Sequence, residues 1–204
     1  TRTAQSDITF AHFLGHGDTE HIMLLPGSVD ECFEFGWKAF DLAERYQTPI
    51  LVMIDLDLGM NNWMCRPFRY PDQPMDRGKV LWENDLDDFE KTHEGKWMQY
   101  WDVDGDGIPY RTLPGNVHPD AAYFARGTGH NDFARYSEEP DVWESTMARL
   151  KMKIENSAKA LPEPILTGSG KAETGLLSFG SCDPAVEEAQ DLFQQNGRLT
   201  DYLR

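Results

Sequence analysis

Two short apolar runs constrain the fold more than any other feature of this 204-residue sequence. The first is Ile22–Leu25, which is closed by Pro26 and Gly27, and the second is Ile50–Ile54. Neither run alternates with polar residues, and a continuous apolar run is typical of a strand that is covered on both faces. The pattern therefore predicts two interior strands of a parallel α/β sheet.

The segment between the two runs predicts an amphipathic helix. Ser28 stands at its start and Glu31 follows three residues later, which predicts a capping box in which each side chain accepts a backbone N–H of the other residue. Three aromatic residues at helical spacing predict the stripe that packs on the sheet: Phe33, Trp37 and Phe40. Gln47–Pro49 ends the helix, so strand, helix and strand form one right-handed βαβ unit.

The rest of the chain predicts a long loop, further helices and a second α/β unit. Residues 59–78 are rich in Pro, Gly and aromatic residues and form the loop, and residues 83–94 form an acidic, solvated turn or short helix. A helix is expected from Pro140 to Ala160. The predicted domains are residues 1–160, a Pro/Gly/Ser-rich linker at 161–171, and residues 172–204, with a strand at 174–181 and a helix from Asp183.

Composition excludes several classes of protein. A formal charge of −16 argues against binding to a phosphate backbone, and no apolar run approaches the length of about 18 residues that a membrane span needs. The three cysteines contain no C-x-x-C pair, so neither a zinc ribbon nor a set of iron–sulfur ligands is encoded, and reduced thiols predict a cytoplasmic protein. Since the sequence starts at Thr1, we expect an interior piece of a longer polypeptide.

Three motifs leave other functions open. Asp102–Gly107 begins like an EF-hand loop, but Leu113 stands where the bidentate glutamate belongs, so the alternative is a calcium-binding or scaffolding domain built on Asp102–Asp106. Four histidines could serve a metallohydrolase: His12, His16, His118 and His130. Gly127-Thr128-Gly129 suggests a phosphate loop, but it lacks the strand-to-helix context of one and predicts a structural loop.

Several blocks, in order, resemble a known family. TRTAQSD, GHGD and LLPGSVDECFEFGWKAFDLAERYQTPILVMIDLDLG are similar to the pyrimidine-binding domain in the alpha subunit of 2-oxoacid:ferredoxin oxidoreductases of the 2-oxoglutarate synthase type. DGIPYRTLPG, YFARGTGHNDFARYSEEP and LLSFGSCDPAVEEA follow as in that family, so the resemblance spans nearly the whole chain. It implies a partial thiamine pyrimidine-binding domain followed by the start of a transketolase C-terminal-like α/β domain.

The resemblance also implies an activity and partners. Such enzymes decarboxylate a 2-oxoacid oxidatively, pass the electrons to ferredoxin and transfer the acyl group to coenzyme A. Thiamine diphosphate, Mg²⁺ and a [4Fe–4S] cluster would be held mainly by a beta subunit in an (αβ)₂ assembly. The upstream glutamate that engages the pyrimidine in this family does not occur in the sequence, so we expect this chain alone to bind none of these cofactors. Which 2-oxoacid is used is left open, with 2-oxoglutarate expected.

Two residues are predicted to bind substrate because of the resemblance. Arg2, in the T-R-T context, matches the arginine that receives the substrate carboxylate in the family, and a guanidinium binds a carboxylate through two hydrogen bonds while staying charged. His16, in Gly15–Asp18, is expected to contact the substrate or the partner subunit. The long loop carries Arg66, Arg69 and Arg77, which either pair with nearby acids or face a partner subunit.

Overall fold

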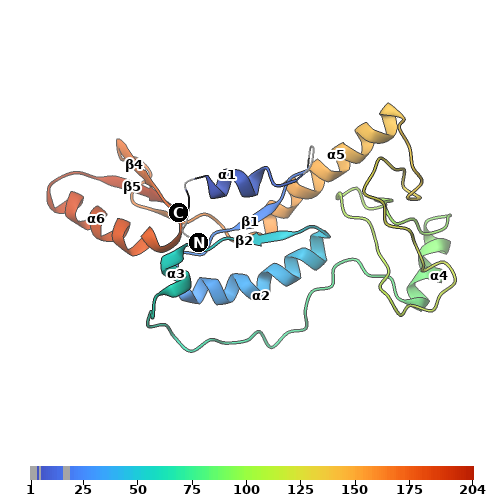
Figure 1. The fold of residues 1–204 in the computed structure, drawn as a ribbon, viewed down its shortest axis with the longest axis horizontal. Helices are drawn as coiled ribbons and strands as arrows, with labels where there is room; N and C mark the ends of the chain where they lie inside the picture. Colours follow the sequence, from blue (N-terminus) through green and yellow to red (C-terminus); the bar gives the residue numbers. More distant parts are fainter. Residues whose placement is uncertain (1–3, 5, 16–18) are drawn as a thin grey trace.

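The computed structural model describes residues 4, 6–15 and 19–204, and its helices and strands follow one another as shown in Figure 1. The first half contains α1 (Asp7–His12), β1 (Ile22–Leu24), α2 (Val29–Tyr46), β2 (Ile50–Val52), α3 (Leu56–Met60) and α4 (Glu83–Thr92). The second half contains α5 (Pro140–Ser157), η1 (Ala158–Ala160), β3 (Leu166–Thr167), β4 (Thr174–Leu177), η2 (Gly180–Cys182), α6 (Asp183–Gln195) and β5 (Thr200–Leu203).

The predicted βαβ unit is present. β1 and β2 pair in parallel with Ile22 opposite Ile50, and α2 lies along one face of the pair while α1 lies on the other side (Figure 1). Ile22 and Leu24 are buried against α2 and Ile108. β2 is only half-buried, so the expectation of two fully covered strands holds for β1 better than for β2.

The stripe of α2 that faces the sheet is not the predicted one. Phe35, Leu42 and Tyr46 are buried in the core, whereas Phe40 is 64% exposed. Phe33 stacks on Phe68 of the long loop, with ring centroids 4.5 Å apart. The prediction was wrong because α2 carries apolar residues on two faces, and the extended segment after α3 covers part of the second face.

The start of α2 follows half of the predicted capping box. The Ser28 hydroxyl accepts the Glu31 backbone N–H at 3.2 Å, as expected. The Glu31 carboxylate accepts the Gly27 N–H at 2.7 Å instead of that of Ser28, and it also binds Arg204. The reciprocal half of the box was therefore wrong, because a distant cation directs the glutamate away from the cap.

A second core forms around α4. Leu86 and Phe89 of this acidic helix are buried with Leu81, Trp97 and Ala121, so the helix is solvated on one face only. The long segment between α3 and α4 contains no helix or strand, as predicted, and runs beside α2 (Figure 1).

The C-terminal region is a second, smaller α/β unit. β4 and β5 pair in parallel with Leu177 opposite Leu203, and β3 adds to β5 in the antiparallel direction. β3 thus lies inside the predicted linker. α6 packs on β5 and begins at Asp183, where the sequence predicted a helix (Figure 1). Along the described residues, no helix is both long and apolar enough to cross a membrane.

Candidate functional site

A cavity of about 870 Å³ opens where the parallel strands of both units end. We call it the strand-end cavity. Leu25 follows β1, Leu56 begins α3 after β2, and Leu177 ends β4. Ile8 of α1 and Phe179 complete an apolar lining, and the polar groups on the wall include Asp55, Ser181 and Arg204. Ligands of open α/β sheets bind at the carboxyl ends of parallel strands, so this position is the expected one for a site.

Asp55 joins the two α/β units at the wall of this cavity. One carboxylate oxygen accepts the Leu58 backbone N–H at 2.9 Å and caps α3, and the other accepts the Ser181 N–H at 2.7 Å. Burial raises the pKa of Asp55, but the backbone hydrogen bonds outweigh burial and hold that pKa below its usual range. Gly180 has φ +73° and a Cβ there would collide with Asp55, so only glycine suits this close approach.

Arg204 is the cation on the described wall of the cavity, and its guanidinium is already occupied. It donates to both oxygens of Glu31 at 2.6 and 2.9 Å, and its Nε lies 3.1 Å from Asp183. The hydrogen bond from Arg204 is the main reason why the pKa of Glu31 is lowered, and Glu31 in turn raises the pKa of Arg204. Because Glu31 and Asp183 engage all three guanidinium nitrogens and compensate the positive charge, Arg204 is not a free anchor for a substrate carboxylate.

Neither predicted substrate-binding residue can be placed against this cavity directly. Arg2 and His16 both lie outside the described residues. Ile8, six positions after Arg2 in the sequence, lines the strand-end cavity, whereas Thr19, three positions after His16, lines a different cavity at the start of β1. The described neighbours of the two residues are therefore at opposite ends of the β1–β2 pair.

Sequence reasoning missed the polar groups that hold this site together. The signal for Asp55 was present, since an aspartate directly after an interior strand is a typical helix N-cap. Arg204 and Glu31 are 173 positions apart, and no local pattern indicates that they pair.

The EF-hand-like loop contains a lysine in place of a metal. The Lys79 ammonium lies 2.7 Å from Asp104 and 2.8 Å from Asp106, and the Asp102 carboxylate accepts backbone N–H groups of the loop itself, including that of Gly107 at 2.7 Å. Burial opposes the charge of Lys79, but the two carboxylates outweigh it and raise the pKa of that lysine. The calcium-binding alternative is not supported, because a side-chain cation already pairs with two of the three carboxylates of the loop.

The three candidate histidines that the structure describes, His12, His118 and His130, do not form a metal site either. His118 pairs with Asp87 at 3.2 Å, and His130 contacts the Thr128 carbonyl at 2.7 Å inside a local turn. Within the described ranges, no group of three or more His, Cys, Asp or Glu residues is arranged to hold a metal ion.

Comparison with known proteins identifies relatives of one kind. Residues 1–73 match the family described as pyruvate flavodoxin/ferredoxin oxidoreductase, thiamine diphosphate-binding. The 2-oxoglutarate synthase subunit KorA of Methanothermobacter thermautotrophicus is 49% identical over 205 residues, which cover all of this chain and 50% of that protein. The alpha subunit of 2-oxoacid:ferredoxin oxidoreductase 2 of Aeropyrum pernix is 30% identical over 202 residues, which cover 97% of this chain and 29% of that protein.

A solved structure has the same fold. It is the 2-oxoglutarate:ferredoxin oxidoreductase from Magnetococcus marinus with 2-oxoglutarate, coenzyme A and succinyl-CoA bound, and it matches 98% of this chain and 33% of that chain with a TM-score of 0.80 at 24% identity. The α/β class with a parallel sheet and the resemblance stated from the sequence are confirmed. The chain spans from under a third to about half of the length of these relatives.

Proposed function

We propose that this chain, which is similar along its whole length to alpha subunits of 2-oxoacid:ferredoxin oxidoreductases, is part of such an enzyme and serves the oxidative decarboxylation of 2-oxoglutarate to an acyl-CoA. The observation that carries this proposal is the 49% identity to the 2-oxoglutarate synthase subunit across the entire chain. The partners in the proposal are a beta subunit, in an (αβ)₂ assembly, and ferredoxin. The free thiols of Cys32, Cys65 and Cys182 suit a reducing cytoplasm.

The described lining of the strand-end cavity suits one end of thiamine diphosphate. Leu25, Leu56 and Phe179 offer an apolar wall for the flat pyrimidine ring. The described cation on that wall, Arg204, is bound by Glu31 and Asp183, so the described residues offer no free positive charge there for a diphosphate. We therefore assign the diphosphate, Mg²⁺ and the [4Fe–4S] cluster to the beta subunit.

These contacts indicate which roles belong to the cofactor and which to the residues of this chain. When bound, thiamine diphosphate supplies the nucleophilic carbon and the electron sink that decarboxylation needs. The residues of this chain exclude water with the apolar wall, and the Asp55–Ser181 hydrogen bond and the Arg204–Glu31 ion pair fix the two α/β units on either side of the cavity. A rigid, largely apolar wall strengthens electrostatic interactions with a charged substrate.

The assay of the complete enzyme tests this function. The protein that contains this chain, purified with its beta subunit, should reduce ferredoxin only when 2-oxoglutarate and coenzyme A are both present. Reduction of ferredoxin with pyruvate but not with 2-oxoglutarate would support the reaction class and contradict the proposed substrate. Absence of reduction with every 2-oxoacid tried, by a complex that has its cofactors, would contradict the function itself.

We propose Arg2 as the anchor of the substrate carboxylate. Ile8 lines the strand-end cavity, and six residues span at most about 20 Å, so the anchor position is within reach of that cavity. A charge-assisted hydrogen bond contributes about 1.5–3 kcal/mol, so Arg2→Ala should raise the KM for the 2-oxoacid by about tenfold or more. Arg198→Ala, on the exposed segment after α6, is the matched control. An unchanged KM in Arg2→Ala would contradict the proposal that Arg2 anchors the substrate carboxylate.

For His16 we propose a contact with the substrate or with the beta subunit. Its described neighbour Thr19 lines the cavity at the start of β1. His16→Ala should therefore either raise the KM of the assembled enzyme for the 2-oxoacid or reduce the amount of beta subunit that co-purifies. A raised KM with full assembly would assign His16 to the substrate.

A further inference from the structure

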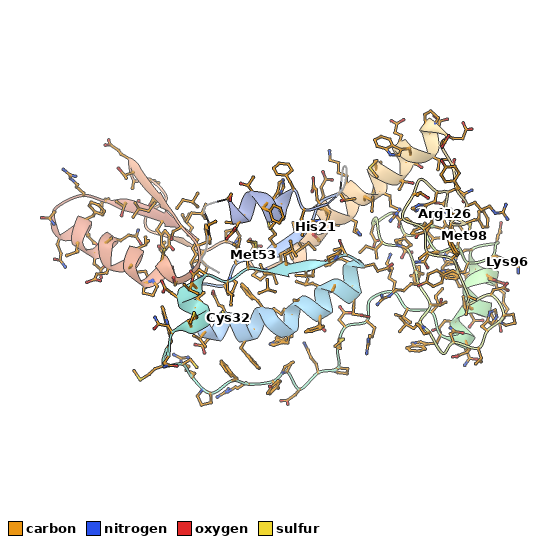
Figure 2. All side chains as sticks on the ribbon, in the orientation of Figure 1. His21, Cys32, Met53, Lys96, Met98 and Arg126 are labelled. Atoms are coloured by element: carbon orange, nitrogen blue, oxygen red, sulfur yellow. The ribbon has the colours of Figure 1, made fainter. Side chains whose placement is uncertain are left out.

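A second cavity lies at the opposite end of the β1–β2 pair from the strand-end cavity. We call it the strand-start cavity; its volume is about 230 Å³. Glu20 and His21 line it where the chain enters β1, and Thr48 lines it where the chain enters β2. Figure 2 shows His21 at the end of β1 that lies beside α5. Lys153 of α5 closes the cavity from that side.

Lys153 is a buried cation with little compensation. Its side chain belongs to a residue that is only 7% exposed, and its ammonium donates to the Gln47 carbonyl at 3.3 Å. No ion pair to a carboxylate of the described residues accompanies that single long hydrogen bond. An ammonium has three N–H donors, so donors remain for another acceptor. A buried charge is normally paired. Without a partner, the loss of its hydration costs a free energy on the order of several kcal/mol.

His21 adds a second unsatisfied group to the same cavity. Both of its ring nitrogens are buried, and neither has a hydrogen-bond partner among the described residues. Buried polar side-chain atoms nearly always have a partner in folded proteins. Two side chains from different elements that line one small cavity thus carry unused hydrogen-bonding positions.

Charges of both signs act on this part of α5: Arg149 acts on Lys153, and Asp102 and Asp132 act in turn on Arg149. The formal charge of the chain is −16, yet Arg149 lies one turn before Lys153 on α5 and its positive charge acts on that lysine. The charged and titratable groups that line the cavity with Lys153 are Glu20 and His21. Burial, assisted by Arg149, lowers the pKa of Lys153 to about 8, so the ammonium form is present at neutral pH but costly without a counter-charge.

We propose that the strand-start cavity is a binding site for a small oxyanion, a carboxylate or a phosphate, held by Lys153 and His21. The cavity is smaller than the roughly 300–1,000 Å³ of pockets that take drug-sized ligands, so its ligand has few heavy atoms. An oxyanion supplies several acceptor lone pairs and a negative charge, which are the two things that Lys153 lacks. The proposal concerns a site apart from the strand-end cavity and does not depend on the proposed enzymatic function.

Equilibrium dialysis of the full chain with inorganic phosphate, and separately with acetate, tests this site. Each anion is titrated against chloride at constant ionic strength at about pH 7, where Lys153 is protonated. The wild-type chain should bind one of the anions saturably. Lys153→Met, which keeps the length of the side chain but removes the charge, should weaken binding by about tenfold or more.

Lys151→Met is the matched control, because Lys151 lies on the same helix with its side chain 75% exposed. It should bind the anion like the wild type, and circular dichroism of both variants checks that they are folded. Binding of phosphate alone identifies a phosphoryl ligand, and binding of acetate alone identifies a carboxylate. Absence of saturable binding of both anions, or equal binding by folded Lys153→Met, overturns the proposal and leaves a cavity that holds water.

The pH dependence of the wild type gives a second readout that needs no variant. The affinity for acetate should fall as the pH rises from about 7 to about 10, because the ammonium loses its proton while acetate stays fully ionised. An affinity that stays constant over this range means that Lys153 does not hold the anion, and the site as proposed fails.

Discussion

Lys153 is the residue at which the sequence pattern and the structure differ most. It follows Leu150 by three positions and precedes Ile154, so it lies on the apolar side of α5, and the structure buries it there. The sequence analysis predicted the helix from Pro140 to Ala160 and assigned no role to this lysine. A lysine within an apolar helical stripe was the available signal, since lysine is almost never fully buried without a partner.

The burial of Lys153 predicts a stability that depends on pH. The folded-state pKa is about 8 against an ordinary value of 10.5, so the unfolded chain binds more protons between these values and stability rises with pH across them. In buffer without small oxyanions, Lys153→Met should therefore raise the free energy of unfolding by up to about 3 kcal/mol near neutral pH.

That gain should shrink as the pH rises toward 10.5, where the lysine is neutral in both states. Urea unfolding at several pH values measures this gain in the free energy of unfolding. The proteins compared are the wild type, Lys153→Met and the exposed control Lys151→Met. A Lys153→Met variant less stable than the wild type at neutral pH would show that the buried ammonium is compensated by a partner within the protein.

At the scale of elements, α2 decides how the first unit packs. Leu42 is buried against the β1–β2 pair, and Phe40, two positions earlier, is 64% exposed. Leu42→Ala should lower the free energy of unfolding by about 2–5 kcal/mol because it leaves a cavity in the core. Phe40→Ala should change it by less than about 1 kcal/mol. Chemical denaturation of both variants checks the corrected assignment. A larger loss of unfolding free energy in Phe40→Ala than in Leu42→Ala would support the stripe that was predicted from the sequence.

The sequence predicted elements better than it predicted contacts. The runs Ile22–Leu25 and Ile50–Ile54 indicated the parallel pair, because a continuous apolar run is typical of a parallel strand that is covered on both faces. Periodicity alone could not choose between the two apolar faces of α2. The choice depends on the segment that carries Phe68, which lies far along the chain and reaches Phe33 only in the folded state.

The candidate site was less predictable for the same reason. The predicted anchor Arg2 came from a resemblance to a family, not from a local pattern. The strand-end cavity exists because strands of two units, separated by more than a hundred residues, end side by side. Asp55 and Ser181 are 126 positions apart, and the hydrogen bond between them follows from how the units pack.

At the scale of the whole molecule, a small number of polar contacts tie the two α/β units together. We propose the boundary between them at residues 161–171, although β3 of that segment already pairs with β5. The Glu31–Arg204 ion pair joins α2 to the end of β5 and is mostly buried, with side-chain exposures of 22% and 11%. Removal of one partner of such a pair leaves the other uncompensated.

This ion pair predicts how the molecule responds to acid. The lowered pKa of Glu31 means that its contribution is complete above the ordinary carboxyl value of 4.5 and is lost as the pH falls through the lower value of the folded state. Glu31→Gln should lower the free energy of unfolding by about 1–3 kcal/mol at neutral pH and have little effect in strong acid.

Glu34→Gln is the control, because Glu34 lies on the same helix with an exposed partner, Lys38. Limited proteolysis should also cut residues 161–171 faster in Glu31→Gln than in Glu34→Gln if the pair holds the units together. Equal cleavage and equal stability of the two variants would mean that the units are joined by other contacts.

The central claim is that the strand-end cavity forms the pyrimidine side of a thiamine diphosphate site, and the affinity of the complete enzyme for that cofactor tests it most directly. Leu177 lines the cavity, is 78% exposed and can be enlarged without disturbing the core, so Leu177→Trp should narrow the cavity at the wall proposed to hold the pyrimidine. Leu192→Trp, on α6 outside the lining and 54% exposed, is the control. Calorimetric titration of the complex should give a Kd for thiamine diphosphate that is about tenfold or more weaker in Leu177→Trp and unchanged in Leu192→Trp. An equal Kd in both variants would contradict the claim.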